Sequence, residues 1–437
     1  MARIEHSHFC SRGWVFSAPD ITCPARTFRR DDGLTVVHQY LPTSPVVVTD
    51  VWVKAGAVAE PDEWSGMAHF LEHMIFKGTE RLAPGSFDRA IESCGGMTNA
   101  ATSHDYAHFF ITTAADRFGD TLPHLAELLL RAGIPDDEFS RERDVVLEEI
   151  LQSYDNPDDL LFEAMMDTLY RHHPYRRPVL GTEDSLRARS PQEMRNFHSF
   201  HYQPNKMTVV VVGGVTETEA LDRVDLCFRE FRPPADYPQV MVPEEPPLDE
   251  IRRRELRLPR LEMARLTLAW PGPGIDRLRD AYGLDVLSVI LAAGRSSRLV
   301  RELRERRQWV QGINSAFSLQ RDSSLFTVSA WLDAEYLDLV EQTIVDRVRQ
   351  LQADLIPEAE LDRAKRQLRN DYAFSTETPA QLAGLYGYYQ TLDRAETAVA
   401  YPARIQAFDA ETLRQIARDY LRLDRYVVTI AVGDELG

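Results

Sequence analysis

The sequence lacks the features of several protein classes. It has only four cysteines (Cys10, Cys23, Cys94 and Cys227), and their spacing contains no CxxC pair. This excludes a disulfide framework and favours a reducing compartment. No apolar run approaches the roughly eighteen residues that a membrane span requires, so no transmembrane helix is predicted. The first residues mix charges and lack the apolar core of a signal peptide. We therefore expect a cytoplasmic protein.

Positive charge is also in short supply. The chain has 50 Lys and Arg residues against 68 Asp and Glu residues, a formal net charge of −18. A general nucleic-acid binder needs a basic surface to neutralise phosphates, so nucleic acid is not an expected partner. Hydrophobic residues make up 44% of the chain, which excludes disorder as the dominant state.

The length of 437 residues predicts two domains. Residues 232–250 hold six of the 25 prolines and are predicted to be a linker between an N-terminal domain, 1–231, and a C-terminal domain, 251–437. Each half mixes β-branched runs with amphipathic helical patterns. The segment TVVVVGGV near the end of the first half is echoed by RYVVTIAVG near the end of the second. We predict an α+β fold with two duplicated domains, each a mainly antiparallel sheet packed with helices.

The residues with the clearest chemistry lie in GMAHFLEHMIFKG, residues 66–78. His69 and His73 are four residues apart on a predicted helix, so their side chains lie about 40° apart on one face and can reach a single zinc ion. Glu72 lies on the same face, where it can contact a water at the metal. This HxxEH order is that of the inverted zincins.

A site with two histidines needs a further ligand, and a carboxylate is usual in hydrolytic zinc sites. The candidates lie on a later predicted helix, residues 136–154. Glu142 and Glu149 are two turns apart and share a face, while Glu148 points about 100° away. Spacing alone does not choose among these three carboxylates.

Five motifs together carry a family resemblance: GMAHFLEHMIFKGT, GGMTNAATSHDYAHF, ERDVVLEEI, HPYRRPVLGTEDSL and HYQPNKMTVVVVGGV. Over about residues 28–432 the chain resembles the pitrilysin-type (M16) zinc metallopeptidases, in particular the zinc-bearing subunits of the two-domain branch similar to mitochondrial processing peptidase. The resemblance implies the LuxS/MPP-like metallohydrolase fold, one zinc ion per chain, and a zinc endopeptidase that hydrolyses peptides or extended presequence-like segments inside a dimer.

The resemblance also implies a role for each matching residue. His69 and His73 match the zinc histidines, Glu149 the third ligand and Glu72 the base that takes a proton from the attacking water. Glu142 matches a carboxylate that orients a ligand imidazole.

Three further residues match substrate-binding positions. Asn99 and Ala100 correspond to an edge strand that holds the substrate backbone, and Arg304 to the first member of an Arg–Tyr pair. The sequence departs from the family at the second member, where Gln311 replaces the Tyr. An amide cannot reproduce the reach and acidity of a phenol. Either this chain has adapted, as a homodimer, or a paralogous subunit supplies the Arg–Tyr pair in a heterodimer.

The alternative function is a scaffold subunit that keeps the fold without catalysis. Such subunits typically lose parts of the metal motif, whereas His69, Glu72, His73 and Glu149 are all present here. The remaining candidates, His173, His198 and His201 among them, are predicted to pack or cap rather than to bind metal.

Overall fold

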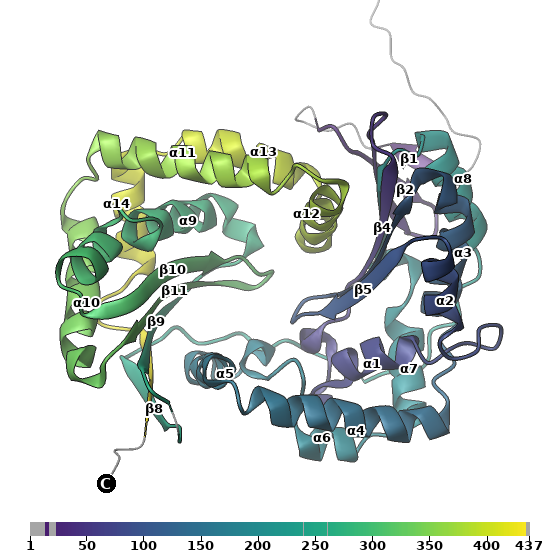
Figure 1. Cartoon of the computed structure of the whole chain (residues 1–437), viewed down its shortest axis with the longest axis horizontal. Helices are drawn as coiled ribbons and strands as arrows, with labels where there is room; N and C mark the ends of the chain where they lie inside the picture. Colours follow the sequence, from purple (N-terminus) through teal and green to yellow (C-terminus); the bar gives the residue numbers. More distant parts are fainter. Residues whose placement is uncertain (1–13, 17–22, 239, 260, 434–437) are drawn as a thin grey trace, which may run out of the picture. The chain divides into compact units, whose positions relative to one another are not determined.

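The chain forms two β-sheets, each packed with helices (Figure 1). The computed structural model describes residues 14–16, 23–238, 240–259 and 261–433. Within these ranges no helix combines the length and the apolar character that a membrane span requires.

The first sheet has seven strands in the order β1-β2-β3-β7-β4-β6-β5. All neighbouring pairs are antiparallel except β3 and β7, which run parallel. The inner strands are β-branched and buried on both faces, β7 along its whole length. The bounds are β1 Trp14–Phe16, β2 Arg26–Arg30, β3 Thr35–Tyr40, β4 Val46–Val53, β5 Met97–Thr102, β6 Ala107–Ala114 and β7 Met207–Gly213.

The second sheet has five strands in the order β10-β11-β9-β12-β8, again with a single parallel pair, β12 with β8. Its order and directions repeat those of β5-β6-β4-β7-β3, which agrees with the predicted duplication. The strand in RYVVTIAVG, β12, takes the place of β7. The bounds are β8 Arg252–Arg257, β9 Ala264–Pro273, β10 Val310–Ser318, β11 Ser323–Leu332 and β12 Val427–Val432.

Helices pack against both sheets, which confirms the predicted α+β class. Those of the first half of the chain are α1 Met67–Ile75, α2 Ser86–Ser93, α3 Phe118–Leu130, α4 Asp136–Ser153, α5 Pro157–Leu169, α6 Glu183–Arg187, α7 Pro191–His201 and α8 Glu217–Cys227. Those of the second half are α9 Leu278–Ala292, α10 Leu337–Ala353, α11 Glu358–Phe374, α12 Pro379–Leu392, α13 Glu396–Gln406 and α14 Ala410–Tyr420. A π-helical segment, Val300–Arg306, precedes β10.

The chain divides into two compact units that each draw on both halves of the sequence. The first unit comprises residues 1–146, 179–240 and 375–399, and the second comprises the rest. Helix α12 therefore packs on β4 and β7 of the first sheet, while α5 packs on β8, β9 and β12 of the second. A linear boundary cannot represent this exchange of helices, so the compact units differ from the predicted continuous ranges 1–231 and 251–437. As a division into two homologous halves, those ranges stay a prediction.

Candidate metal centre

Helix α1 is fixed at its start by a buried carboxylate. Glu60 is 1% exposed, and its two oxygens accept from the N–H groups of Gly66 at 3.0 Å and Ala68 at 2.7 Å. These are among the first N–H groups of the helix, which have no partner inside it and favour a negative charge. The apolar face of α1 is buried, with Phe70, Leu71, Met74 and Ile75 all at 0% exposure.

Two glycines hold the start of α1 against the segment that precedes α6. Gly66 has φ +91°, and a Cβ on it would lie 2.5 Å from the carbonyl oxygen of Leu180. Gly181 has φ +79°, and a Cβ on it would lie 2.4 Å from the carbonyl oxygen of Ser65. Only glycine fits such a backbone contact. This contact joins two segments that are distant in the sequence, GMAHFLEH and VLGTEDSL.

The structure brings His69, His73 and Glu149 together. One donor atom from each lies within 4.8 Å of the other two. Glu149 is carried by α4, and the boundary between the compact units falls inside this continuous helix, after Val146. Burial, and then the nearby His73, lower the pKa of His69 to about 4. His69 is therefore neutral at pH 7 and offers a lone pair, as a metal ligand must. Two imidazoles and one carboxylate are a donor set that suits zinc.

Glu142 contacts the far side of His73. Its Oε1 lies 3.0 Å from Nδ1 of His73, and its Oε2 lies 2.6 Å from Nζ of Lys77. A proton on Nδ1 that is donated to this carboxylate leaves Nε2 with its lone pair for a metal. Sequence reasoning missed Lys77, although it follows His73 by four residues within the same motif.

Glu72 is half-buried and held by a hydroxyl. The Oγ1 of Thr102, the last residue of β5, donates to Oε2 of Glu72 at 2.6 Å. Burial, and then the charge of Glu72, raise the pKa of Tyr202 well above its usual value. Neither Thr102 nor Tyr202 was among the predicted site residues. The only available signal was that both lie inside family motifs.

Strand β5 forms an edge of the first sheet, and in the described part of the chain it pairs only with β6. Asn99 is exposed and Ala100 half-buried. The side-chain oxygen of Asn99 accepts from the N–H of Ala100 at 2.9 Å. The unpaired side of an edge strand can bind an extended peptide through its backbone.

Arg304 lies in the second unit, within the π-helical segment. Its Nε and Nη2 donate to Oε1 of Glu305 at 3.1 and 2.7 Å. Gln311 is exposed on β10. The structure thus gives Arg304 an acidic neighbour that the sequence analysis did not consider.

Three other buried histidines, which were predicted to pack or cap, make contacts away from the His69, His73 and Glu149 group. His173 accepts from the N–H of Tyr175 at 3.1 Å and caps a short helical turn. The Nε2 of His198 lies 2.7 Å from the carbonyl oxygen of Leu129, and burial lowers the pKa of His198 to about 4. His201 packs among three aromatic rings, and burial followed by the charge of a nearby lysine lowers its pKa to about 3.

Comparison with known proteins agrees with this architecture. The family profile described as "Insulinase (Peptidase family M16)" matches residues 35–183, and that described as "Peptidase M16 inactive domain" matches residues 189–368. An uncharacterized zinc protease of Mycobacterium leprae is 31% identical over 353 residues, which cover 79% of this chain and 77% of the relative.

Two further comparisons cover most of the chain. A probable mitochondrial-processing peptidase subunit beta of Arabidopsis thaliana is 26% identical over 98% of this chain and 81% of its own length. The crystal structure of a protease from Helicobacter pylori superposes with a TM-score of 0.87 at 28% identity, covering 93% of this chain and 99% of the other. With both profiles matched in order and this structural likeness over nearly the full length, the chain belongs to peptidase family M16.

Proposed function

We propose that this chain is a zinc-dependent endopeptidase that hydrolyses extended peptide segments. His69, His73 and Glu149 hold the zinc ion, and Glu72 acts as the general base. The observation that carries the proposal is the convergence of three donor side chains within 4.8 Å of one another. Two of them, His69 and His73, lie on α1, which also presents Glu72. Zinc proteases among the relatives support the same conclusion.

A zinc ion held by His69, His73 and Glu149 would act as a Lewis acid that polarises the scissile carbonyl and lowers the pKa of water. Glu72 takes the proton of the attacking water and returns it to the leaving amine. The hydroxyl of Thr102 donates to Oε2 of Glu72 at 2.6 Å and so orients the carboxylate for this transfer. Glu142 accepts a hydrogen bond from Nδ1 of His73 and so keeps that imidazole oriented.

The substrate backbone adds to the free edge of β5. Asn99 then releases the N–H of Ala100, which it binds at 2.9 Å, to a peptide carbonyl. This mode selects extended segments by their backbone, because an edge strand presents N–H and C=O groups in register.

The enzyme works as a dimer, and its partner is a paralogous subunit that supplies the Arg–Tyr pair. Gln311 in place of the family's Tyr supports this part of the proposal, as does the relative named as a subunit of mitochondrial-processing peptidase. Donors aimed at a developing oxyanion contribute about 10²–10³-fold each in rate. A chain that lacks one should be slow when it acts alone.

Peptide cleavage by the zinc-loaded chain, measured alone and with the candidate paralogue, tests the proposal. We expect weak turnover alone, a rise of about 100-fold on mixing, and loss of both rates with a chelator that zinc reverses. Robust turnover alone with no gain on mixing would contradict the heterodimer and favour a homodimer that uses Arg304. No turnover in either case would favour the scaffold alternative.

A further inference from the structure

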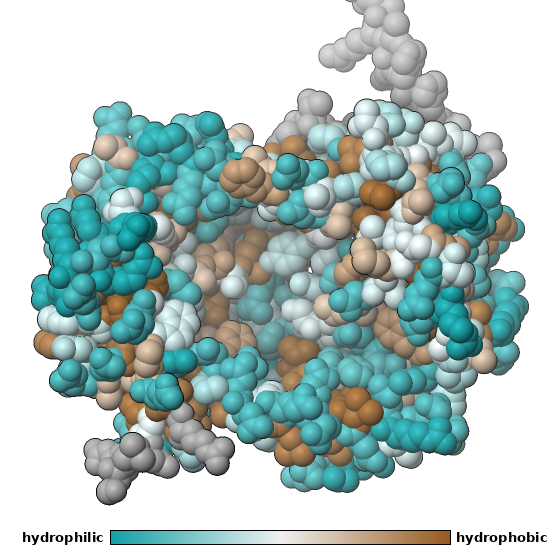
Figure 2. All heavy atoms as spheres, viewed as in Figure 1, coloured by the Kyte–Doolittle hydropathy of each residue, from teal (hydrophilic) through white to brown (hydrophobic). Residues whose placement is uncertain are grey.

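A second polar site lies entirely within the second unit. A cavity of about 570 Å³ opens between the π-helical segment, α10 and α11. Hydrophilic residues cover the surface where α10 lies (Figure 2). The cavity is lined by six arginines and two glutamates, an excess of four positive charges on a chain whose net charge is −18. The arginines are Arg298, Arg301, Arg306, Arg307, Arg347 and Arg363.

Both carboxylates of the cavity are already occupied by arginines. Glu360 binds Arg298 through two hydrogen bonds, at 2.9 and 2.7 Å. Glu302 accepts from Nε of Arg347 at 2.7 Å and from Nη2 of Arg307 at 3.0 Å. Three of the six guanidinium groups are therefore neutralised at least in part inside the protein.

The other three arginines have no carboxylate. Among the described residues, neither Arg301 nor Arg306 makes a side-chain hydrogen bond or ion pair, and both are exposed to the cavity and solvent. Arg363 donates from Nη1 to the carbonyl oxygen of Ala293 at 3.3 Å, while its buried Nη2 meets no acceptor in the described chain. Burial lowers the pKa of Arg363; the charge of Glu360 opposes this shift, and repulsion from Arg301 adds to it. Arg301 and Arg306 are therefore held near Arg363 without an ion pair of their own among the described residues.

The π-helical segment places Arg301 and Arg306 on the same side of the helix. Arg301 and Arg306 are five residues apart, which in an α-helix would turn their side chains about 140° away from each other. A π-helix joins residues five apart by its backbone hydrogen bonds, as the bond from the N–H of Arg307 to the carbonyl of Glu302 does here at 3.0 Å. Both arginines therefore line the same cavity. π-Helical turns are rare in proteins, and those that occur often lie at functional sites.

We propose that this cavity binds a small molecule that carries two or more linked phosphate groups. Guanidinium groups bind phosphate oxygens through paired, charge-assisted hydrogen bonds. The volume lies within the range of about 300–1,000 Å³ that small-molecule sites occupy. The excess of positive charge suits a di- or triphosphate better than a single phosphate or a sulfate. The site is independent of the proposed peptidase activity.

Titration calorimetry of the intact, zinc-loaded protein tests this with tripolyphosphate, sulfate and citrate at one ionic strength. We expect saturable binding of one tripolyphosphate per chain, and binding of sulfate and citrate at least tenfold weaker. Citrate that binds as tightly as tripolyphosphate would contradict the phosphate assignment. The absence of saturable tripolyphosphate binding would overturn the site.

Variants separate this cavity from binding at zinc or elsewhere on the surface. Arg301→Gln and Arg306→Gln each remove a guanidinium that holds no internal ion pair, so folding should be preserved, and each should weaken tripolyphosphate binding about tenfold. Arg369→Gln, at an exposed position on α11 outside the cavity, is the matched control and should leave the affinity unchanged. Equal losses in all three variants, or none in the first two, would refute the proposal.

Discussion

The two sheets share one order over five strands, yet among the described residues both histidines of the metal-ligand group lie on the helix that follows β4 of the first sheet. Between β4 and β5, the chain of the first unit forms α1, which presents His69, Glu72 and His73. Between β9 and β10, the chain of the second unit forms α9, whose buried residues are mostly apolar. Within the part of the chain that the structure describes, a group of three potential metal ligands occurs once.

The comparison shows that this topology does not need polar residues in its helices. In α9, Leu284, Leu287, Ile290 and Leu291 all lie at 0% exposure, and burial of such side chains stabilises by about 1.5–3 kcal/mol each. At α1 the fold instead accommodates buried charge, with Glu60 at 1% and Glu142 at 8% exposure. Buried charges are costly unless they are hydrogen-bonded, so a cluster of this kind is better explained by function than by stability.

The largest expected effect is the loss of peptide turnover when Glu72, the proposed general base, is substituted. Glu72→Gln should retain zinc, because the amide can still accept from Thr102, and should lower peptide turnover by about 10²–10⁴-fold because it cannot take a proton. Glu92→Gln, an exposed carboxylate on α2, should leave turnover unchanged. Zinc content and cleavage rate are measured together. Turnover of Glu72→Gln within tenfold of the parent would remove Glu72 from the mechanism.

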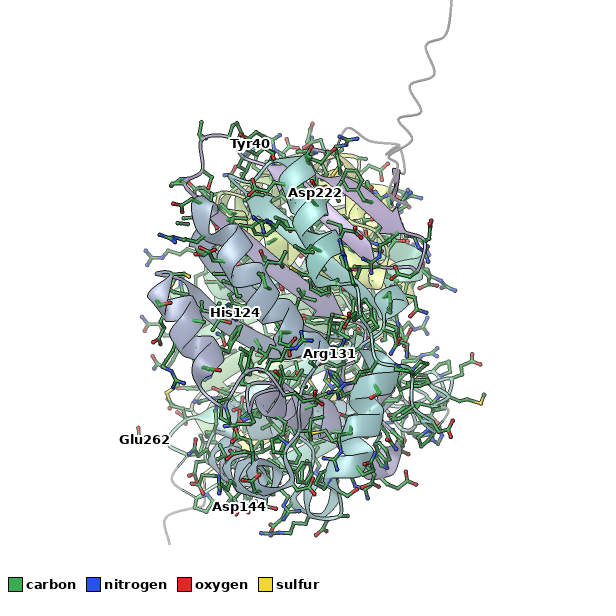
Figure 3. The ribbon with its side chains drawn as sticks, turned by 90° about the vertical axis from the view of Figure 1, so that its right-hand side faces the viewer. Tyr40, His124, Arg131, Asp144, Asp222 and Glu262 are labelled. Atoms are coloured by element: carbon green, nitrogen blue, oxygen red, sulfur yellow. The ribbon has the colours of Figure 1, made fainter. Side chains whose placement is uncertain are left out.

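A smaller effect is expected from substituting Glu142, which contacts the ligand His73. Glu142→Gln weakens the acceptor for Nδ1 of His73 and leaves Lys77 without its carboxylate, so zinc affinity should fall about 10–100-fold. Asp144→Asn, two residues along α4 and exposed (Figure 3), is the control. Competition with a chromogenic chelator measures both. Equal affinities of the two variants would mean that Glu142 does not orient the imidazole.

The packing of α12 on the first sheet can be tested by substituting its glycines. Gly387 of α12 packs on the first sheet so closely that a Cβ would lie 2.0 Å from Nε1 of Trp52. Gly387→Ala should therefore destabilise the protein by about 1–3 kcal/mol. Gly384→Ala, one turn earlier with no atom within 4 Å of the added Cβ, should stabilise α12 by up to about 1 kcal/mol. Denaturant unfolding distinguishes them, and the same sign for both would argue against this packing.

The smallest effect concerns acid stability of the first unit. The folded state holds His201 neutral, with a pKa of about 3 against an ordinary value of 6.5. Below pH 6.5 the unfolded state gains a proton that the folded state does not, so stability falls as the pH drops. This group contributes at most about 1.4 kcal/mol per pH unit. Urea unfolding at pH 7.5 and 5.5 should show a smaller difference for His201→Phe, and an unchanged difference for the exposed His172→Gln. An unaltered slope in His201→Phe would contradict this assignment.

Local patterns in the sequence were enough to predict many of the helices and strands, and to place His69 and His73 on one face of a helix. The β-branched run of β4 and the helical spacing of His69 and His73 depend on neighbours within one strand or turn. The structure adds that Glu149, rather than Glu142 or Glu148, forms a group of potential metal ligands with the two histidines. Helix spacing alone had left the choice among these three carboxylates open.

What the sequence could not provide depends on distant contacts. Nothing local shows that α5 packs on the second sheet or α12 on the first, since each is an ordinary amphipathic or apolar helix. The hydrogen bond from Thr102 to Glu72 joins a strand end to a helix 30 residues earlier. The role of Glu60 likewise depends on how the chain turns before α1. Such contacts are set by tertiary packing, which propensity and spacing do not encode.

The most direct test of the central claim is anomalous diffraction at the zinc edge, on crystals of protein purified without chelators. The account predicts one zinc ion per chain, with its peak between His69, His73 and Glu149, and no second zinc peak. No zinc in the protein, or a peak away from these three side chains, would contradict it.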